Sequence, residues 1–136
     1  MKGIAVLGGA IVLTALLAWA ISFKNGRFAA KPDGEHLAAD VLGSSLGERA
    51  TLVQFSSAFC APCRATRVLL TDIAAKTPGV VTIEIDAEER LELTRQLNIL
   101  RTPTVLVLDA DGRITRRASG LPRRDQVLAA LGEAVA

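Results

Sequence analysis

The sequence predicts an α/β fold, a mixed central sheet with helices on both faces, preceded by one N-terminal transmembrane helix. Strand-like and helix-like patterns alternate through the C-terminal two thirds of the chain. An uncharged apolar run fills residues 4–23 near the N-terminus. We therefore divide the chain into an anchor (1–23), a tether and lead-in (24–47) and one α/β domain (48–136).

The apolar run, residues 4–23, is rich in Leu, Ala, Val and Ile. About twenty apolar residues match the roughly 30 Å hydrocarbon core of a bilayer. A cleaved signal peptide is the alternative, because Lys2 gives a short basic region and Ala18-Trp19-Ala20 fits a small-x-small cleavage site. Because the run continues to Phe23, we favour a retained, single-pass anchor in the cell membrane, with residues 4–23 contacting lipid.

The charge balance excludes one class of partner. Lys2 is the only charged residue before position 24, so the remainder carries 15 basic and 14 acidic groups. A nearly neutral domain is not expected to bind nucleic acid. Its tether, rich in Gly and small residues, should lead into a partly helical segment at 37–42 that packs against the domain edge, with His36 on the surface.

The first strand of the domain leads directly into a helix. Residues 51–55 are β-rich and mostly apolar, as a buried central strand should be. Residues 56–59 turn the chain, and apolar residues recur at helical spacing from Cys60 until Thr77-Pro78-Gly79 ends the segment. Cys60 is therefore expected at or beside a helix N-terminus.

The rest of the domain continues the alternation, giving the order β-α-β-α-β-β-α. We predict a half-buried strand and then a helix that Asp86 caps. An apolar strand buried on both faces, a hairpin turn, a polar edge strand and an amphipathic helix complete the domain. These elements cover residues 80–86, 87–97, 104–108, 109–112, 113–118 and about 122–135.

Cys60 and Cys63, the only cysteines, carry the chemistry. Two thiols at this spacing across a helix start can close a disulfide and reopen it. Free N–H groups and the helix dipole stabilise a thiolate at Cys60, the predicted nucleophile, while Cys63 lies further in and resolves the mixed disulfide. Pro62 needs no N–H partner in the first turn. Arg64 adds positive charge near the thiolate, although a solvated helix face explains it as well.

Two other uses of the cysteine pair remain open. A structural disulfide closing such a short loop restrains the unfolded chain less than a long loop does. A zinc site needs four ligands, and beyond the thiols the chain offers only His36 and carboxylates. We expect no metal and no cofactor beyond the redox-active disulfide Cys60–Cys63.

Several motifs resemble the thioredoxin superfamily over about residues 48–136. They are the strand and C-x-x-C at 54–64, the strand Ile83-Glu84-Ile85-Asp86, the loop Arg101-Thr102-Pro103-Thr104 and Ser119-Gly120. The resemblance implies that Pro103 is cis and faces the cysteines. It also implies that Thr102 and Pro103 offer backbone groups to an extended substrate segment. We assign Phe59 and Pro62 to the same substrate-binding surface.

Three residues depart from the usual thioredoxin pattern. Gln54 replaces a buried acid beneath the resolving cysteine, and an amide cannot accept and release a proton there. Thr82 replaces a lysine, and both changes are common among membrane-tethered, TlpA-like relatives. Phe59 replaces a tryptophan and is still expected to shield the thiolate.

The resulting prediction is a membrane-anchored thiol–disulfide oxidoreductase, a monomer that reduces disulfides in protein substrates and is itself reduced by an upstream thiol electron donor. A non-enzymatic binding module with idle cysteines and a disulfide-donating oxidase are the alternatives. Lys2 lies before the anchor and Lys24, Arg27 and Lys31 after it, a count that slightly favours a cytoplasmic domain. The resemblance favours an extracytoplasmic domain, which we expect.

Overall fold

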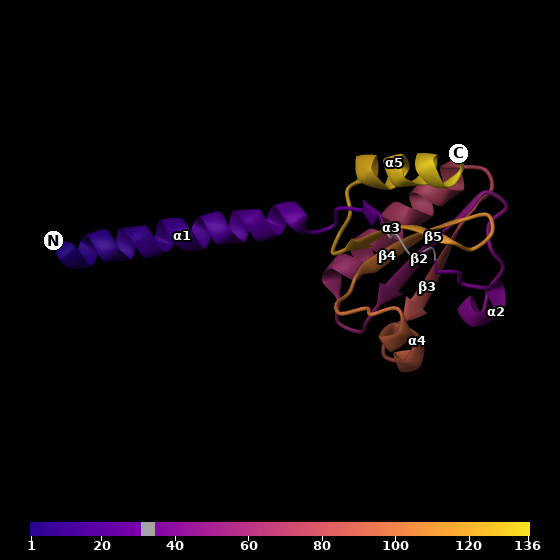
Figure 1. The fold of residues 1–136 in the computed structure, drawn as a ribbon, viewed down its shortest axis with the longest axis horizontal. Coiled ribbons are helices and arrows are strands. Elements are labelled where there is room, and N and C mark those ends of the chain that lie inside the picture. Colours follow the sequence, from indigo (N-terminus) through magenta and orange to yellow (C-terminus); the bar gives the residue numbers. More distant parts are fainter. Residues whose placement is uncertain (31–34) are drawn as a thin grey trace.

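The computed structural model describes residues 1–30 and 35–136, and it contains one five-stranded sheet in the order β1-β5-β4-β2-β3 (Figure 1). β2 runs parallel to β3 and antiparallel to β4, while β5 runs antiparallel to β4 and β1. The predicted mixed sheet is confirmed. The elements are α1 (Lys2–Lys24), β1 (Ala29–Ala30), α2 (Ala39–Leu42), β2 (Ala50–Ser56), α3 (Ala61–Lys76), β3 (Val80–Asp86), α4 (Leu91–Gln96), β4 (Thr104–Asp109), β5 (Ile114–Ser119) and α5 (Arg124–Ala134).

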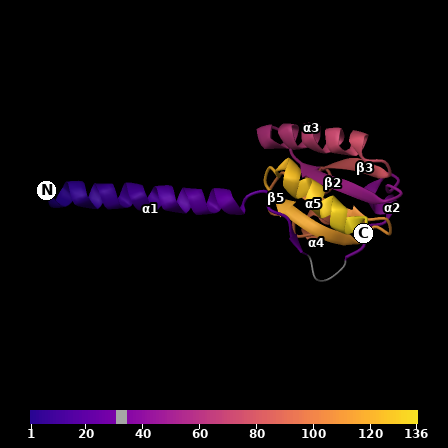
Figure 2. The same ribbon diagram turned by 90° about the horizontal axis from the view of Figure 1, so that it is seen from above.

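Helices cover both faces of the sheet, so the domain has two apolar cores (Figures 1 and 2). β2 is buried along its whole length, and its residues alternate between the cores. Leu52 packs with Leu70 of α3 and Leu131 of α5, which we call the α3–α5 layer. On the opposite face Phe55 packs with Leu93 of α4, in what we call the α2–α4 layer.

The lead-in contributes to the second of these cores. Leu37 and Leu42 are both buried there, and α2 supplies the predicted helical turn. His36 is exposed, as expected, and its backbone forms an isolated antiparallel β-bridge with Arg113, the residue before β5. The division of the chain at residue 48 stays a prediction.

Two details differ from the sequence prediction. β5 was expected at the sheet edge, but β1 pairs outside it, with Ala29 opposite Arg117. A two-residue strand shows no periodicity from which it could be found. The helix predicted at 87–97 is shortened to α4, and Asp86 does not cap it, because its Oδ1 accepts the backbone N–H of Glu88 in a local turn.

α1 projects away from the domain, and every one of its residues is exposed (Figure 1). Its 23 residues extend over roughly 35 Å at 1.5 Å per residue. The helix is long and apolar enough to cross a bilayer.

The chain meets the domain almost immediately after α1. The Gly26 N–H donates to the Ser119 carbonyl at 2.6 Å, and Arg101 Nη2 donates to Asn25 Oδ1 at 2.7 Å. Gly26 has a φ of 73°, and a Cβ there would lie 2.0 Å from the Leu121 carbonyl oxygen, so only glycine fits. We call these contacts the anchor junction. Residues 31–34 of the predicted tether, Lys31 among them, lie outside the described residues.

Candidate functional site

Cys60 and Cys63 form a disulfide at the start of α3, with an Sγ–Sγ distance of 2.13 Å. Cys60 is the N-cap residue of the helix, and its Sγ accepts the Cys63 backbone N–H at 3.2 Å. Cys60 is partly exposed, whereas Cys63 is only 2% exposed. The predicted position of Cys60 and the deeper burial of Cys63 are confirmed. An attacking thiol from outside can therefore reach Cys60 more readily than Cys63.

Gln54 lies beneath the cysteine pair on the buried strand β2. Its side chain is 2% exposed, and its Nε2 donates to the Cys63 carbonyl at 2.8 Å. This hydrogen bond ties the first turn of α3 to the sheet. The amide carries no titratable proton, so proton transfer at Cys63 has to use another group.

The loop before β4 lies beside Cys60. The Thr102–Pro103 peptide bond is cis, as predicted, and Pro103 is buried. Thr102 Oγ1 lies 3.8 Å from Cys60 Sγ and 2.8 Å from Ser57 Oγ. The Pro103 carbonyl accepts the Gly120 N–H at 2.7 Å, which fixes the loop to the end of β5. A hydroxyl donor is thus held near the outer sulfur.

A groove of about 660 Å³ runs along this loop, and we call it the site groove. It brings together three residues predicted to bind substrate, Pro62 at the start of α3 and Thr102 and Pro103 in the loop. Two further walls were not predicted from the sequence. They are formed by Ser22 and Asn25 at the end of α1, and by Gly120, Leu121 and Arg123 before α5.

Phe59 and Arg64 lie outside the lining of this groove. The Phe59 side chain is 106% exposed and its φ is 60°, so the ring extends into solvent. The expectation that Phe59 shields the sulfur is wrong, because a ring this exposed packs against no neighbouring group. Arg64 is exposed, and no ion pair joins it to another residue in the described part of the chain.

An ion pair behind the site was not found from the sequence. Arg67 of α3 pairs with Glu84 of β3, and Ser56 Oγ at the end of β2 donates to Glu84 Oε1 at 2.9 Å. The Arg67 hydrogen bond, together with that from Ser56, holds the pKa of Glu84 below its ordinary value against the opposing effect of burial. The signal available was an acid on the exposed face of a strand and an arginine on the preceding helix.

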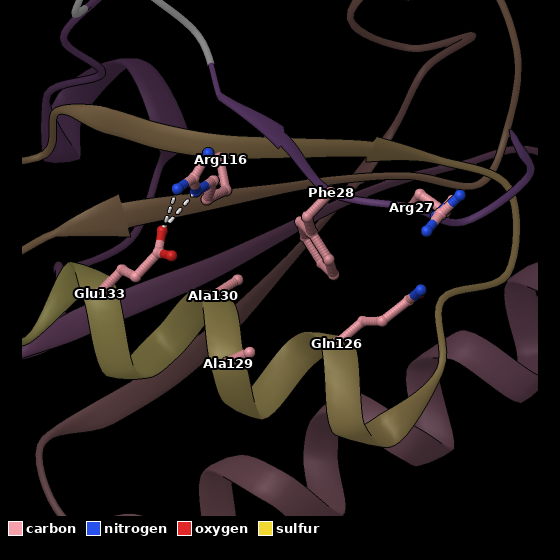
Figure 3. Close-up of a pocket in the computed structure, with 7 residues that line it drawn as sticks. All are labelled: Arg27, Phe28, Arg116, Gln126, Ala129, Ala130 and Glu133. Atoms are coloured by element: carbon pink, nitrogen blue, oxygen red, sulfur yellow. Dashed lines mark hydrogen bonds and ion pairs between the residues drawn. The ribbon is translucent and has the colours of Figure 1, made fainter.

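A second hollow lies between β1, β5 and α5 (Figure 3). Figure 3 shows the Phe28 ring lying over α5 and the Arg116–Glu133 ion pair at one end. Gln126 Oε1 is buried there without a hydrogen-bond partner among the described residues. This hollow carries no thiol. Among residues 1–30 and 35–136, no group of three or more His, Cys, Asp or Glu side chains is placed to hold a metal ion.

A family model described as Thioredoxin matches residues 35–133. The chain belongs to the thioredoxin family. The matched thioredoxin domain includes both cysteines and Pro103, and it leaves α1 outside.

Individual thioredoxins agree with this assignment. Thioredoxin from Alicyclobacillus acidocaldarius is 32% identical over 88 residues, which cover 64% of this chain and 83% of that protein. Putative thioredoxin H10 from Arabidopsis thaliana is 36% identical over 62 residues, 46% of this chain and 40% of that protein. Thioredoxin H5 from Oryza sativa is 28% identical, and the match covers 53% of each chain. The chain thus spans about half or less of the length of the last two relatives.

Solved structures show the same fold. A mutant thioredoxin from Halobacterium salinarum superposes with a TM-score of 0.59 at 18% identity, covering 65% of this chain and 77% of that one. Thioredoxin f from spinach chloroplast superposes with a TM-score of 0.58 at 22% identity, and the match covers 66% of this chain and 80% of that one. In this chain the loop that carries cis-Pro103 lies beside the disulfide, with Thr102 Oγ1 3.8 Å from Cys60 Sγ.

Proposed function

We propose that this protein is a membrane-anchored thiol–disulfide oxidoreductase that reduces disulfides in protein substrates. One observation carries the proposal, the unequal exposure of Cys60 and Cys63 beside cis-Pro103. The accessible sulfur sits at a helix N-terminus and near the Thr102 hydroxyl, two features that stabilise a thiolate.

In the reduced protein, the Cys60 thiolate attacks one sulfur of a substrate disulfide. A mixed disulfide forms, and the other substrate sulfur leaves as a thiolate that takes up a proton. The Cys63 thiol then loses its proton and attacks Cys60 Sγ, which expels the second substrate sulfur. Two electrons pass to the substrate, and the Cys60–Cys63 bond is left as it is in the structure. An upstream dithiol donor returns both cysteines to thiols.

The substrate segment is proposed to lie extended in the site groove. There it pairs as an added strand with backbone groups of Thr102 while contacting Pro62 and Pro103. Phe59 is a further contact, because its exposed ring is free to pack on a docked partner. In this scheme Arg64 tunes the thiolate through charge alone.

Anchoring is proposed from α1, whose residues make up the N-terminal apolar run and are all exposed. Residues 4–23 would lie in lipid as a single span, with the thioredoxin domain on the extracytoplasmic side. We propose a monomer, since the site is complete within one chain.

Trapping tests the exchange reaction. Cys63→Ser should accumulate mixed disulfides through Cys60, because no second thiol can release the substrate. Cys60→Ser is the matched control and should trap nothing. If Cys63→Ser forms no adducts with disulfide proteins, the cysteines are idle and the protein is a binding module.

Two further measurements test direction and location. A reduction potential near about −120 mV, that of a strong oxidant, would make the protein a disulfide donor in place of a reductase. Labelling of reduced Cys60 by a membrane-impermeant reagent in intact cells is expected for an extracytoplasmic domain. Labelling only after lysis would place the domain in the cytoplasm.

A further inference from the structure

One wall of the site groove is built by the membrane anchor itself. Ser22 and Asn25, at the end of α1, line the same groove as Pro62, Thr102 and Pro103. Cys60 lies beside this groove, 3.8 Å from the hydroxyl of the lining residue Thr102, so a segment that fills the groove and reaches Cys60 lies against the last turn of α1.

This wall is held in place by the anchor junction. Arg101, next to Thr102, donates to Asn25 Oδ1 at 2.7 Å, and the Gly26 N–H donates to the Ser119 carbonyl at 2.6 Å. Gly120 packs so closely that a Cβ there would lie 2.7 Å from Arg101 Nη2 and 3.2 Å from the Gly26 nitrogen. One backbone hydrogen bond, one side-chain hydrogen bond and this close packing leave little freedom between α1 and the groove.

The position of the groove along α1 sets where the groove lies relative to the bilayer surface. The apolar run ends at Phe23, α1 ends at Lys24, and Asn25 already lines the groove. The Trp19 and Phe23 rings contact each other in a tilted arrangement with centroids 4.9 Å apart, and the Arg27 guanidinium lies 5.8 Å from the Phe23 ring centroid. Aromatic rings followed by cations mark the membrane–water interface. With α1 in a bilayer, the groove opens at the bilayer surface.

The charges of the groove indicate what it accepts. Arg101 and Arg123 are its charged lining residues, and no carboxylate lines it among the described residues. Arg101 donates to neutral oxygens, Asn25 Oδ1 and the Ser119 carbonyl at 3.5 Å, so its charge is not neutralised by these contacts. Arg123 pairs with Asp125 at 3.3 Å, but both side chains are largely exposed and the pair is screened. The groove therefore favours an acidic segment.

We propose that the site groove binds an extended, acidic polypeptide segment directly flanking a membrane span of a partner protein, and that Cys60 exchanges with a disulfide in that segment. The inference rests on the exchange activity and the anchoring proposed above. A soluble folded substrate, by contrast, would have to insert a disulfide between the domain and the bilayer surface.

The test uses the full-length, reduced protein in phosphatidylcholine vesicles. Two single-span model peptides share those vesicles, each with one two-cysteine disulfide loop and acidic flanks. In the first peptide the loop directly follows the span, and in the second it lies about twenty residues further away. Both peptides are confined to the same membrane, so their surface concentrations match. The near loop should be reduced roughly tenfold faster, as effective concentration falls with spacer length.

A variant separates the anchor wall from simple confinement. A flexible Gly-Ser linker of about eight residues between Asn25 and Gly26 adds a reach of roughly 15 Å and leaves every domain residue in place. The ratio of the near-loop reduction rate to the far-loop reduction rate should then fall toward one. Soluble insulin should be reduced at least as fast by the linker variant, because both cysteines are unchanged and the domain can move away from the bilayer surface.

The outcomes distinguish this inference from the proposed function. If the unmodified protein reduces near and far loops equally but still reduces insulin, the juxtamembrane inference is overturned and the oxidoreductase remains. A near preference that survives in the linker variant also overturns it, because the anchor wall is then not its cause. Failure to reduce any of the three disulfides overturns the proposed function itself. Equal rates for acidic and lysine-flanked near loops would remove the acidic specificity.

Discussion

The hydroxyl oxygens of Ser57 and Thr102 lie 2.8 Å apart, which joins the turn before Cys60 to the loop that carries cis-Pro103. The same Thr102 hydroxyl lies 3.8 Å from Cys60 Sγ. Ser57 therefore helps to hold a donor beside the outer sulfur, where a thiolate forms after reduction.

Thr102→Val keeps the side-chain shape and removes this donor. A hydrogen bond contributes about 0.5 to 1.5 kcal/mol, so we expect Cys60 in the reduced variant to be alkylated roughly two- to tenfold more slowly. Iodoacetamide labelling at neutral pH, followed by mass spectrometry, measures this rate. Thr82→Val, on the exposed face of β3, is the matched control. Equal rates in all three proteins would show that Thr102 does not stabilise the thiolate.

Gln54→Glu places an acid under the resolving cysteine. The new carboxylate can accept the Cys63 proton, and general base help of this kind contributes about 10² to 10⁴ in rate at best. We expect the mixed disulfide to decay faster in Gln54→Glu, measured by stopped-flow kinetics with a fluorescent substrate.

The same substitution replaces the amide that donates to the Cys63 carbonyl at 2.8 Å. The unfolding free energy of the Gln54→Glu variant should therefore fall by about 1 to 3 kcal/mol. Gln54→Leu loses the same hydrogen bond without adding a base, so it should be destabilised without being accelerated. An acceleration in Gln54→Leu would mean that proton transfer is not the cause.

Glu84 should make folding stability depend on pH. Because Arg67, and then Ser56, hold its folded-state pKa below the ordinary value, the carboxylate contributes fully above the unfolded-state pKa. That contribution is lost as the pH falls through the folded-state pKa. Glu84→Gln should thus destabilise the protein at neutral pH and have a diminishing effect toward acid.

Urea unfolding at neutral and acidic pH measures both states of Glu84. Glu92→Gln, on the exposed face of α4, controls for the removal of one negative charge. If the Glu84→Gln effect is the same at both pH values, the ion pair does not stabilise the folded state.

Gly26→Ala should disrupt the anchor junction. A Cβ at Gly26 would lie 2.0 Å from the Leu121 carbonyl oxygen, whereas Gly43 has a similar φ, 72° against 73°, and open space around it. Gly43→Ala should cost only the left-handed backbone penalty of about 1 to 2 kcal/mol. Gly26→Ala should lower the folding stability by more than this, or detach α1 from the domain. Proteolysis between α1 and β1 reports the detachment, and equal cleavage of both variants would contradict the junction.

Much of the site could be predicted from the sequence because its determinants are local. Cys60 and Cys63 lie in one segment, where a change from strand-like to helical periodicity marks the N-terminus of α3. Cis-Pro103 followed from family resemblance and the short motif Arg101-Thr102-Pro103-Thr104.

Features made by distant segments could not be predicted in this way. Asn25 and Arg101 are 76 positions apart, so their contact leaves no pattern in the sequence. An acid on a strand and an arginine on the preceding helix are visible in the sequence, but they do not by themselves indicate that Arg67 and Glu84 pair. β1 was missed because two alanines acquire strand geometry only by pairing with Arg116 and Arg117 of β5. The exposure of Phe59 was not predicted, because its positive φ is set by the folded turn and leaves no pattern in the sequence.

The two layers of the domain are unequal, and this should appear in native-state hydrogen exchange. The α3–α5 layer is made by helices of 16 and 11 residues, whereas α2 and α4 have 4 and 6. Short helices with few buried contacts open locally at low free energy. Amides of α2 and α4 should therefore exchange in partial openings that leave β2 and α3 protected. The dithiol then stays correctly placed while the far side of the protein fluctuates.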